Sequence, residues 1–513
     1  MRSRLAGLLV IGALLASACG TQLDEDEVAA HALQQASLGR ADDGDVTSGP
    51  APTNEGVSAP STAPSEAVVA GPATTTVVDA PGTGASPETT STNGEPGTTP
   101  AAPTAAPTAP DGSGAPPPAA VVDTRSMPPG GNGGATDVGV YEDRIVIYNV
   151  TDRTGAVPGL FQDAQEATQA YILKFLSEQG TVYGRTIELV NRDSKMSTQE
   201  NRAAYLDACN DAFAAVGSMS AFEQGAAEPI RSCGIPDVRT SAVTQELQTE
   251  PWVRSTLALT PGLVGMSEWG YLADEFGDIV TDAAFLYIDG ATTHWNTSQV
   301  VEATERHRGY EWDLHIAIAL SEVNYASIIQ QLKDADIRLV AFQGAYQQAV
   351  RLARTMRQQN YQPEVFMLQA NTYMPDMITE GGEVMEGFTL VSVTGSLLEE
   401  GNPELTEYAT WLARVNPRAR PTGLGQFGWG AAKMFVEAIT ALGPNLTRQG
   451  LLDHINANYT AYGADGLFPE QNIATQVPAS CVIILDVTAE GFVRRAPDTG
   501  YRCGELGDIR DAA

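Results

Sequence analysis

The residues best suited to chemistry lie in short segments that each follow an apolar, strand-like run. These segments are 151–160, 217–222, 240–244, 289–296, 343–346 and 369–373. They are rich in Ser, Thr, Asn, Gly and aromatic residues and poor in Lys and Arg. Hydroxyl and amide groups hydrogen-bond a small polar or zwitterionic ligand, whereas a polyphosphate ligand would call for cationic side chains.

The sequence contains no familiar catalytic motif. It has no G-x-S-x-G elbow, no H-E-x-x-H and no P-loop, and the segment 217–221 resembles a nucleophile elbow but lacks the second glycine. The histidines also show no metal-ligand spacing. We therefore predict a chain that is not an enzyme and holds no metal and no cofactor. A hydrolase built without a local motif is the alternative.

Apart from Cys19, the cysteines are Cys209, Cys233, Cys481 and Cys503, which allow three disulfide pairings. The local pairs, 209 with 233 and 481 with 503, would each close a loop that stabilises the fold by about 3–4 kcal/mol. A zinc site is the alternative, but no C-x-x-C and no nearby His supports it. We expect structural disulfides and an oxidising compartment.

The first residues are typical of an export signal. Arg2 and Arg4 precede an apolar run from Leu5 to Leu15, which is too short to span a bilayer. The following small residues lead to Cys19 and resemble a bacterial lipobox, in which that cysteine becomes lipid-modified. We predict a lipoprotein signal peptide over 1–18 and an extracytoplasmic protein that is lipid-anchored to the bacterial cell membrane. An ordinary signal peptide is the alternative, because Ala16 stands where the usual motif has Leu.

Residues 19–140 form a Pro/Thr/Ala/Gly-rich segment with almost no large apolar side chains. Such a segment cannot bury enough surface to offset its conformational entropy, so we expect a disordered tether that its prolines stiffen. The whole chain of 513 residues carries a formal charge of −33. This acidity argues against nucleic acid as a partner, because a nucleic-acid binder needs clustered Lys and Arg.

After residue 140 the pattern alternates between apolar strands and amphipathic helices. One series begins with a strand over 144–150 and includes a helix that Ser197 opens in a capping box with Glu200. A second series begins with a strand over 283–288. Strands that are apolar on both faces and separated by helices predict an α/β fold with two doubly wound parallel-sheet lobes. Ligands of such sheets bind beyond the carboxyl ends of the strands, where the polar segments lie.

With these loops placed, the region from about 143 to 503 resembles a type 1 periplasmic binding protein of the branched-chain amino-acid-binding kind. The phrases that carry the resemblance are 149–155, 183–193, 215–220, 235–236 and 344–346, which occur in family order. The resemblance implies a Venus-flytrap fold whose lobes are joined by a three-strand hinge. It places the crossings near 254–259, 388–395 and 460–465.

The same resemblance implies the domain limits and the function. The first lobe would comprise 141–257 with 392–462, the second 258–391 with 463–503, and residues 504–513 would be a tail. The family's members capture a small solute between the lobes and present it to an ABC-type permease. We therefore expect solute capture for import. The alternative is a ligand-sensing lipoprotein that regulates a receptor or a cell-envelope partner.

In relatives, hydroxyl and backbone N–H groups after the third and fourth strands hold the charged ends of the ligand, and aromatic residues of the second lobe close over it. The corresponding residues here are Ser218, Ser220, Thr240, Ser241, Ala242, Trp295, Tyr346 and Asn371. Val243 stands where aliphatic amino-acid binders carry Thr, and Ala370-Asn371 stands where they carry the acidic partner of the ammonium group. Without that carboxylate a buried ammonium lacks its partner, which argues against Leu, Ile or Val as the ligand.

Overall fold

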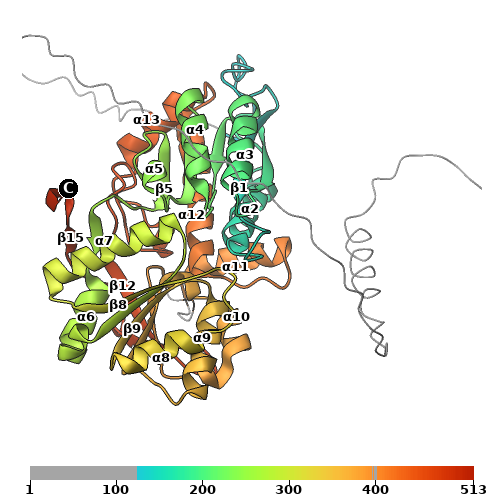
Figure 1. The fold of residues 1–513 in the computed structure, drawn as a ribbon. Coiled ribbons are helices and arrows are strands. Elements are labelled where there is room, and N and C mark those ends of the chain that lie inside the picture. The colour runs from blue at the N-terminus through green and yellow to red at the C-terminus, as the bar shows by residue number, and fades with distance from the viewer. Residues whose placement is uncertain (1–123, 396, 398–400, 513) are drawn as a thin grey trace, which may run out of the picture. The chain divides into compact units, whose positions relative to one another are not determined.

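The computed structural model describes residues 124–395, 397 and 401–512 (Figure 1). The predicted signal peptide, Cys19 and most of the predicted tether lie outside these residues.

Most of the described strands belong to two sheets. The strands are β1 (Arg144–Thr151), β2 (Thr186–Asp193), β3 (Ala214–Val216), β4 (Asp237–Ser241), β5 (Val253–Leu257), β6 (Leu263–Gly265), β7 (Ala283–Ile288), β8 (Trp312–Ile318), β9 (Leu339–Gln343), β10 (Val365–Leu368), β11 (Thr389–Ser392), β12 (Cys481–Val487), β13 (Phe492–Ala496), β14 (Arg502–Cys503) and β15 (Leu506–Asp508). The helices are α2 (Gln162–Glu178), α3 (Thr198–Asp211), α4 (Ala227–Cys233), α5 (Gln245–Gln248), α6 (Ser267–Phe276), α7 (Ala291–Arg308), α8 (Ala326–Asp334), α9 (Tyr346–Gln358), α10 (Pro375–Gly381), α11 (Pro403–Val415), α12 (Gly423–Leu442) and α13 (Arg448–Asn458).

The first sheet has the strand order β2-β1-β3-β4-β5 and is parallel throughout. Alternate residues of β1 face opposite layers, since Ile145 and Ile147 pack with α2 and α12 while Val146 and Tyr148 pack with α3 and α4. Both faces are thus covered by helices, which explains why the strand is apolar without a polar side. The predicted capping box is present in part, because the Ser197 hydroxyl accepts the Glu200 N–H at the start of α3.

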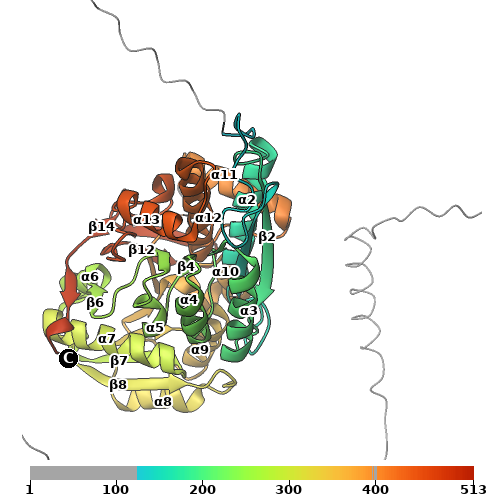
Figure 2. The ribbon, with the colours of Figure 1, turned by 90° about the horizontal axis from the view of Figure 1, so that it is seen from above.

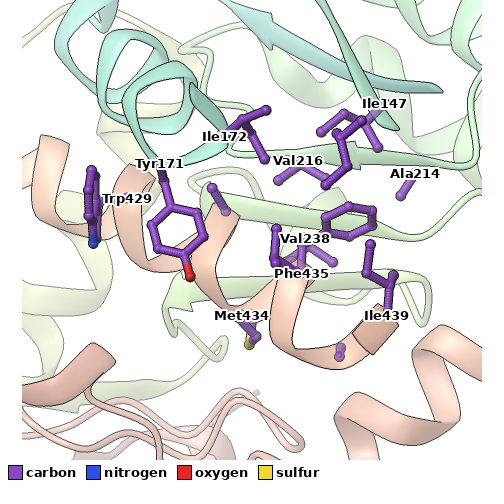
Figure 3. Packing of buried hydrophobic residues seen from close by; sticks show 14 of the residues in the cluster. Ile147, Tyr171, Ile172, Ala214, Val216, Val238, Trp429, Met434, Phe435 and Ile439 are labelled. Atoms are coloured by element: carbon purple, nitrogen blue, oxygen red, sulfur yellow. The ribbon is translucent and has the colours of Figure 1, made fainter. Parts of the chain in front are cut away.

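Helices from distant parts of the chain pack on the first sheet. In Figures 1 and 2, α2 lies beside α11 and α12, although more than two hundred residues separate them in the sequence. Figure 3 shows Tyr171 of α2 next to Trp429 of α12, and their ring centroids are 4.9 Å apart in an edge-on arrangement. The close approach requires Gly428, because a Cβ added there would meet the Ala164 carbonyl oxygen at 2.4 Å.

The second sheet has the order β13-β12-β11-β10-β9-β7-β8. Its strands β8, β7, β9, β10 and β11 are parallel, whereas β12 and β13 run antiparallel to their neighbours. Phe342 and Leu286 face α8 and α9, while Phe285 and Ala341 face α6 and α7. The structure therefore confirms the α/β class and the two parallel-dominated sheets.

Three connections join the two sheets within the described residues, after β5, after β11 and between α13 and β12. They are hydrogen-bonded to one another, because Gln471 bonds the backbone at Thr256 and Ala258, and the Gly395 N–H donates to Leu467 at 2.7 Å. These contacts tie the three connections together where they cross.

The ends of the described chain are more ordered than their composition predicts. The side chain of Asn132, inside the predicted tether, is buried and donates to the carbonyls of Glu142 and Tyr183. Arg185 holds the same segment by donating to the carbonyls of Asn132 and Gly134. Residues 504–513, expected as a tail, contain β15, which pairs with β6. Composition misses these contacts because they depend on backbone groups.

Two disulfides cross-link elements of the fold. Cys209 of α3 is bonded to Cys233 of α4, and Cys481 of β12 is bonded to Cys503 of β14. Of the pairings that the sequence allows, the structure thus has the local one.

Candidate ligand-binding site

A cavity of about 470 Å³ lies at the carboxyl ends of strands from both sheets. All the polar segments singled out in the sequence contribute to its wall, through Leu160, Ala221, Ser241, Thr293, Gln343 and Asn371 among others. The connections between the sheets contribute as well, through Leu259, Val393 and Gln471. The position agrees with the rule that parallel sheets bind ligands beyond their carboxyl edges.

The wall of this cavity is mainly apolar. Its large apolar side chains are those of Val157, Leu160, Phe161, Met196, Met219, Phe222, Val243, Leu257, Leu259, Leu263, Val264, Ile288, Val300, Leu320, Val393, Leu424 and Val482. Among the described residues that line it, none is Lys, Arg or His, and the charged ones are Glu268 and Asp289. The loops between strand and helix thus supply more apolar surface than their Ser, Thr and Asn content predicts.

Two polar atoms of the wall have no hydrogen-bond partner among the described residues. They are the Ser241 hydroxyl at the end of β4 and the Gln224 Oε1 after β3, and both atoms are buried. An unpaired polar atom away from water costs about 1–3 kcal/mol, so a partner supplied by a ligand would be favourable.

The carboxylate of Asp152 accepts hydrogen bonds that the loop after β3 donates. It accepts hydrogen bonds from the Ser194 hydroxyl at 2.6 Å, the Met196 N–H at 3.0 Å, the Ser220 hydroxyl at 3.0 Å and the Ala221 N–H at 2.8 Å. The side chain is fully buried. The loop is therefore organised around a carboxylate of the protein itself.

The carboxylate of Glu223 accepts the backbone N–H groups of the loop after β4. One carboxylate oxygen accepts the N–H groups of Val243 and Thr244, the latter at 2.9 Å. The other oxygen pairs with Arg239, which also contacts Asp237 at 3.1 Å. All three charged side chains are fully buried.

These groups shift one another's pKa values. Burial raises the pKa of Glu223 to about 7, while Arg239 and the N–H groups of Thr244 and Val243 act in the opposite direction. Burial alone would lower the pKa of Arg239, but Glu223 and Asp237 raise it above its ordinary value. Arg239 is therefore charged at every relevant pH.

Glu268, in the first turn of α6, lies in the cavity wall without a cationic partner. The structure shows no salt bridge and no hydrogen bond between its carboxylate and another described residue. Burial raises the pKa of Glu268 to about 7. Near neutral pH this group can either donate a proton in a hydrogen bond or carry a negative charge.

Most of the hydroxyls predicted to hold a ligand are instead used inside the first lobe. The Ser218 hydroxyl accepts the Val150 N–H at 3.0 Å, and the Thr240 hydroxyl donates to the Gly217 carbonyl at 3.0 Å. With Ser220 bonded to Asp152, none of the three lines the cavity, and neither does Ala242. Only Ser241 of this group belongs to the wall.

Of the predicted ligand-binding residues in the second lobe, one lines the cavity and two do not. Asn371 lines the cavity and donates to the Gly344 carbonyl at 2.5 Å. Tyr346 packs in the core of the second lobe, and its hydroxyl donates to Glu380 at 2.9 Å. Trp295 is half-buried on α7 and is not part of the wall.

Sequence reasoning missed the glutamines and Glu268. The wall contains Gln224, Gln248, Gln299, Gln343, Gln348, Gln369 and Gln471. Gln343 and Gln369 lie in the polar segments, so their position after a strand was the available signal. Glu268 follows β6, a short strand outside the predicted series, and no pattern in the sequence indicates it.

Within the described residues, no helix is long and apolar enough to cross a membrane. In the same part of the chain, no group of three or more His, Cys, Asp or Glu side chains is arranged to hold a metal ion.

The fold and the cavity define a two-lobed, Venus-flytrap solute-binding protein. A family model described as periplasmic binding protein matches residues 145–491, which is more than half of the chain. The chain therefore belongs to the periplasmic binding protein family, in its type 1 form, as its resemblance indicated. The family is extracytoplasmic, and its members are typically substrate-binding proteins of ABC transporters rather than enzymes.

Solved structures share the fold at low identity. The substrate-binding protein of a fatty acid ABC transporter from Thermomonospora curvata is 21% identical with a TM-score of 0.62, over 72% of this chain and 94% of that one. A leucine binding protein from Thermotoga maritima is 15% identical with a TM-score of 0.58, over 72% and 99%. A solute binding protein from R. palustris in complex with 4-hydroxybenzoate is 14% identical with a TM-score of 0.57, over 72% and 98%. No curated protein matches the sequence.

Proposed function

We propose that this protein is an exported, lipid-anchored solute-binding protein that captures a small ligand between its two lobes and delivers it to an ABC-type permease. The observation that carries the proposal is the cavity whose wall combines the carboxyl edges of both sheets. A ligand that contacts both edges stabilises the arrangement in which they face each other, and this is the physical basis of closure.

Further features support capture over catalysis. The unpaired Ser241 hydroxyl and Gln224 Oε1 offer hydrogen bonds to a ligand. The related structures named above are the substrate-binding protein of a fatty acid ABC transporter, a leucine binding protein and a solute binding protein in complex with 4-hydroxybenzoate. This fold therefore accommodates chemically different solutes. The expected lobe limits are 141–257 with 392–462 for the first lobe and 258–391 with 463–503 for the second. Ala464, Leu467, Phe468 and Ile473 pack in the core of the first lobe, so we extend its last segment to about residue 473.

Membrane attachment is proposed through Cys19, with residues 19–140 as the tether, in which Asn132 contacts the first lobe. Replacing Cys19 by Ser removes the sulfur that would carry the lipid. The variant should move from the membrane fraction to the soluble extracytoplasmic fraction and lose incorporation of labelled palmitate. Retention of Cys19→Ser in the membrane fraction with label would contradict a lipid on this residue.

Ligand capture can be tested by thermal unfolding of the full chain with a panel of amino acids, alkanols, alkylamines, alkanoates, benzoates, sugars and polyamines. A ligand at about 100 times its dissociation constant stabilises the folded state by about 2.7 kcal/mol. Ala291→Trp, which places a large side chain in the cavity wall, should abolish the shift. Ala335→Trp is the control, because Ala335 is exposed at the end of α8, away from the cavity.

Import and sensing predict different cellular results. Deletion of the protein should abolish uptake of the labelled panel compound that stabilises it. Normal uptake after deletion, together with intact binding, would favour the sensing alternative. A folded protein that no panel compound stabilises would contradict solute capture.

A further inference from the structure

We propose that the cavity takes a ligand with an apolar body and an uncharged or positively charged polar end, and that it discriminates against carboxylates. This inference rests on the proposed function, namely that the cavity is the solute-binding site. It names the chemical class of the solute.

The first argument concerns the hydrogen-bond donors at the carboxyl edge of the first sheet. The N–H of Ala221 and the hydroxyl of Ser220 donate to Asp152. The N–H groups of Val243 and Thr244 donate to Glu223. A ligand carboxylate would need several such donors to replace its hydration, and these are already engaged by carboxylates of the protein.

The second argument concerns charge. Among the described residues that line the cavity, none can supply a positive charge, and Glu268 and Asp289 supply negative charge. Arg239, on the strand that leads into the loop after β4, is fully buried and paired with Glu223 and Asp237. A carboxylate that entered the cavity would therefore lose hydration without gaining a counter-ion, which is strongly unfavourable.

The third argument concerns the body of the ligand. Leucine, isoleucine, valine, methionine and phenylalanine side chains dominate the wall. Burial of apolar ligand surface against them is favourable in proportion to the area removed from water. The volume of about 470 Å³ falls within the range of sites for drug-sized ligands. The main part of the binding free energy should thus come from apolar contact.

The polar end has defined partners. The Ser241 hydroxyl and the Gln224 Oε1 are buried, unpaired and part of the wall. Oε1 is an acceptor and the hydroxyl is both donor and acceptor, so together they suit a hydroxyl, amide or amine group. The Glu268 carboxylate, which also lacks a partner, can face a positive charge.

The test compares three octyl probes that differ in their polar end, together with leucine as an amino acid. Binding of 1-octanol, octylamine, octanoate and leucine to the full chain is measured by titration calorimetry at neutral pH. We expect octanol and octylamine to bind at least about tenfold more tightly than octanoate and leucine, a difference of about 1.4 kcal/mol.

Two other outcomes would overturn the inference. Octanoate or leucine binding as tightly as octanol and octylamine would overturn the inference and leave the proposed function intact. If none of these probes binds, the inference is overturned as well. The thermal-unfolding panel then decides separately whether the protein binds any solute.

A matched pair of variants tests the placement of the polar end. Ser241→Ala should weaken octanol binding by about two- to tenfold, because one hydrogen bond is lost. Ser255→Ala is the control, since Ser255 on the neighbouring strand β5 also has a buried, unpaired hydroxyl but does not line the cavity. Equal octanol affinity in both variants would overturn the role of Ser241.

Discussion

The carboxylate of Glu223 accepts the backbone N–H of Thr244 at 2.9 Å, so the loop that follows β4 is held by a side chain of the short helical turn after β3. The same carboxylate pairs with Arg239, which itself donates to the Ser241 carbonyl at 2.8 Å. A buried ionic cluster therefore fixes the backbone at Ser241, a residue of the cavity wall whose buried hydroxyl is unpaired.

Replacing Arg239 by Met should strongly destabilise the protein. The substitution leaves Glu223 and Asp237 buried without their cation, and breaking a buried pair costs about 3–5 kcal/mol. The measurement is the free energy of unfolding from urea denaturation of the purified chain. Arg202→Met is the control, because Arg202 pairs with Glu228 at 2.6 Å with both side chains exposed. A similar loss in the two variants would contradict the importance of burial.

The contact between α2 and α12 predicts a second stability effect. A Cβ at Gly428 would meet the Ala164 carbonyl oxygen at 2.4 Å, so Gly428→Ala must push the helices apart. Overpacking of this kind costs about 1–3 kcal/mol. Gly265→Ala is the control, because the nearest atoms around its added Cβ are 3.7 Å away. A lower urea midpoint for Gly428→Ala alone is expected, and an unchanged midpoint would contradict the tight crossing.

The strands and helices could be predicted because their signals are local. The apolar run at 144–150 became β1, and Ser197 caps α3 as its sequence position indicated. The order of 124–140 could not be predicted, because it depends on Arg185 donating to carbonyl groups of that segment. Such backbone contacts leave no trace in composition.

The six polar segments all reach the cavity, yet most of the individual hydroxyls chosen from them do not. Ser220 is bonded to Asp152, which lies almost seventy residues earlier in the chain. Ser241 belongs to the cavity wall and has an unpaired hydroxyl, whereas the hydroxyl of its immediate neighbour Thr240 donates to the Gly217 carbonyl. Successive side chains at the end of a strand point to opposite faces, and this alternation decides which hydroxyl has no hydrogen-bond partner. The sequence alone does not tell which residues point to which face.

Replacing either disulfide should lower the stability of the protein by a similar amount, but only one replacement should affect ligand binding. Cys209–Cys233 and Cys481–Cys503 have sequence separations of 24 and 22, so replacing either pair by Ser should cost about 3 kcal/mol. Cys481 lines the cavity, whereas neither Cys209 nor Cys233 does. Only loss of the second pair should therefore weaken octanol binding, measured by calorimetry on the folded variants. Equal octanol affinity in both double variants would contradict the placement of Cys481.

Glu268 predicts a pH dependence whose sign follows from its raised pKa. Burial raises this pKa from 4.5 to about 7, so between these values the folded chain holds a proton that the unfolded chain has lost. The contribution of Glu268 to the free energy of unfolding should thus fall as the pH rises through this window. Nearby Tyr310 stays uncharged, because burial and then Glu268 raise its pKa further above its ordinary value. Glu268→Gln should make the fall in urea titrations smaller without abolishing it, because burial also raises the pKa of Glu223 to about 7.

Ligand binding should show the opposite trend with pH. As Glu268 loses its proton toward and above about pH 7, a negative charge develops in the cavity wall and octylamine should bind more tightly, while octanol binding should change little. Glu268→Gln should abolish the pH dependence of octylamine binding. Glu275→Gln is the control, because Glu275 is exposed on the same helix and does not line the cavity. If octylamine affinity kept its pH dependence in Glu268→Gln, another group would have to supply the charge that faces the ligand.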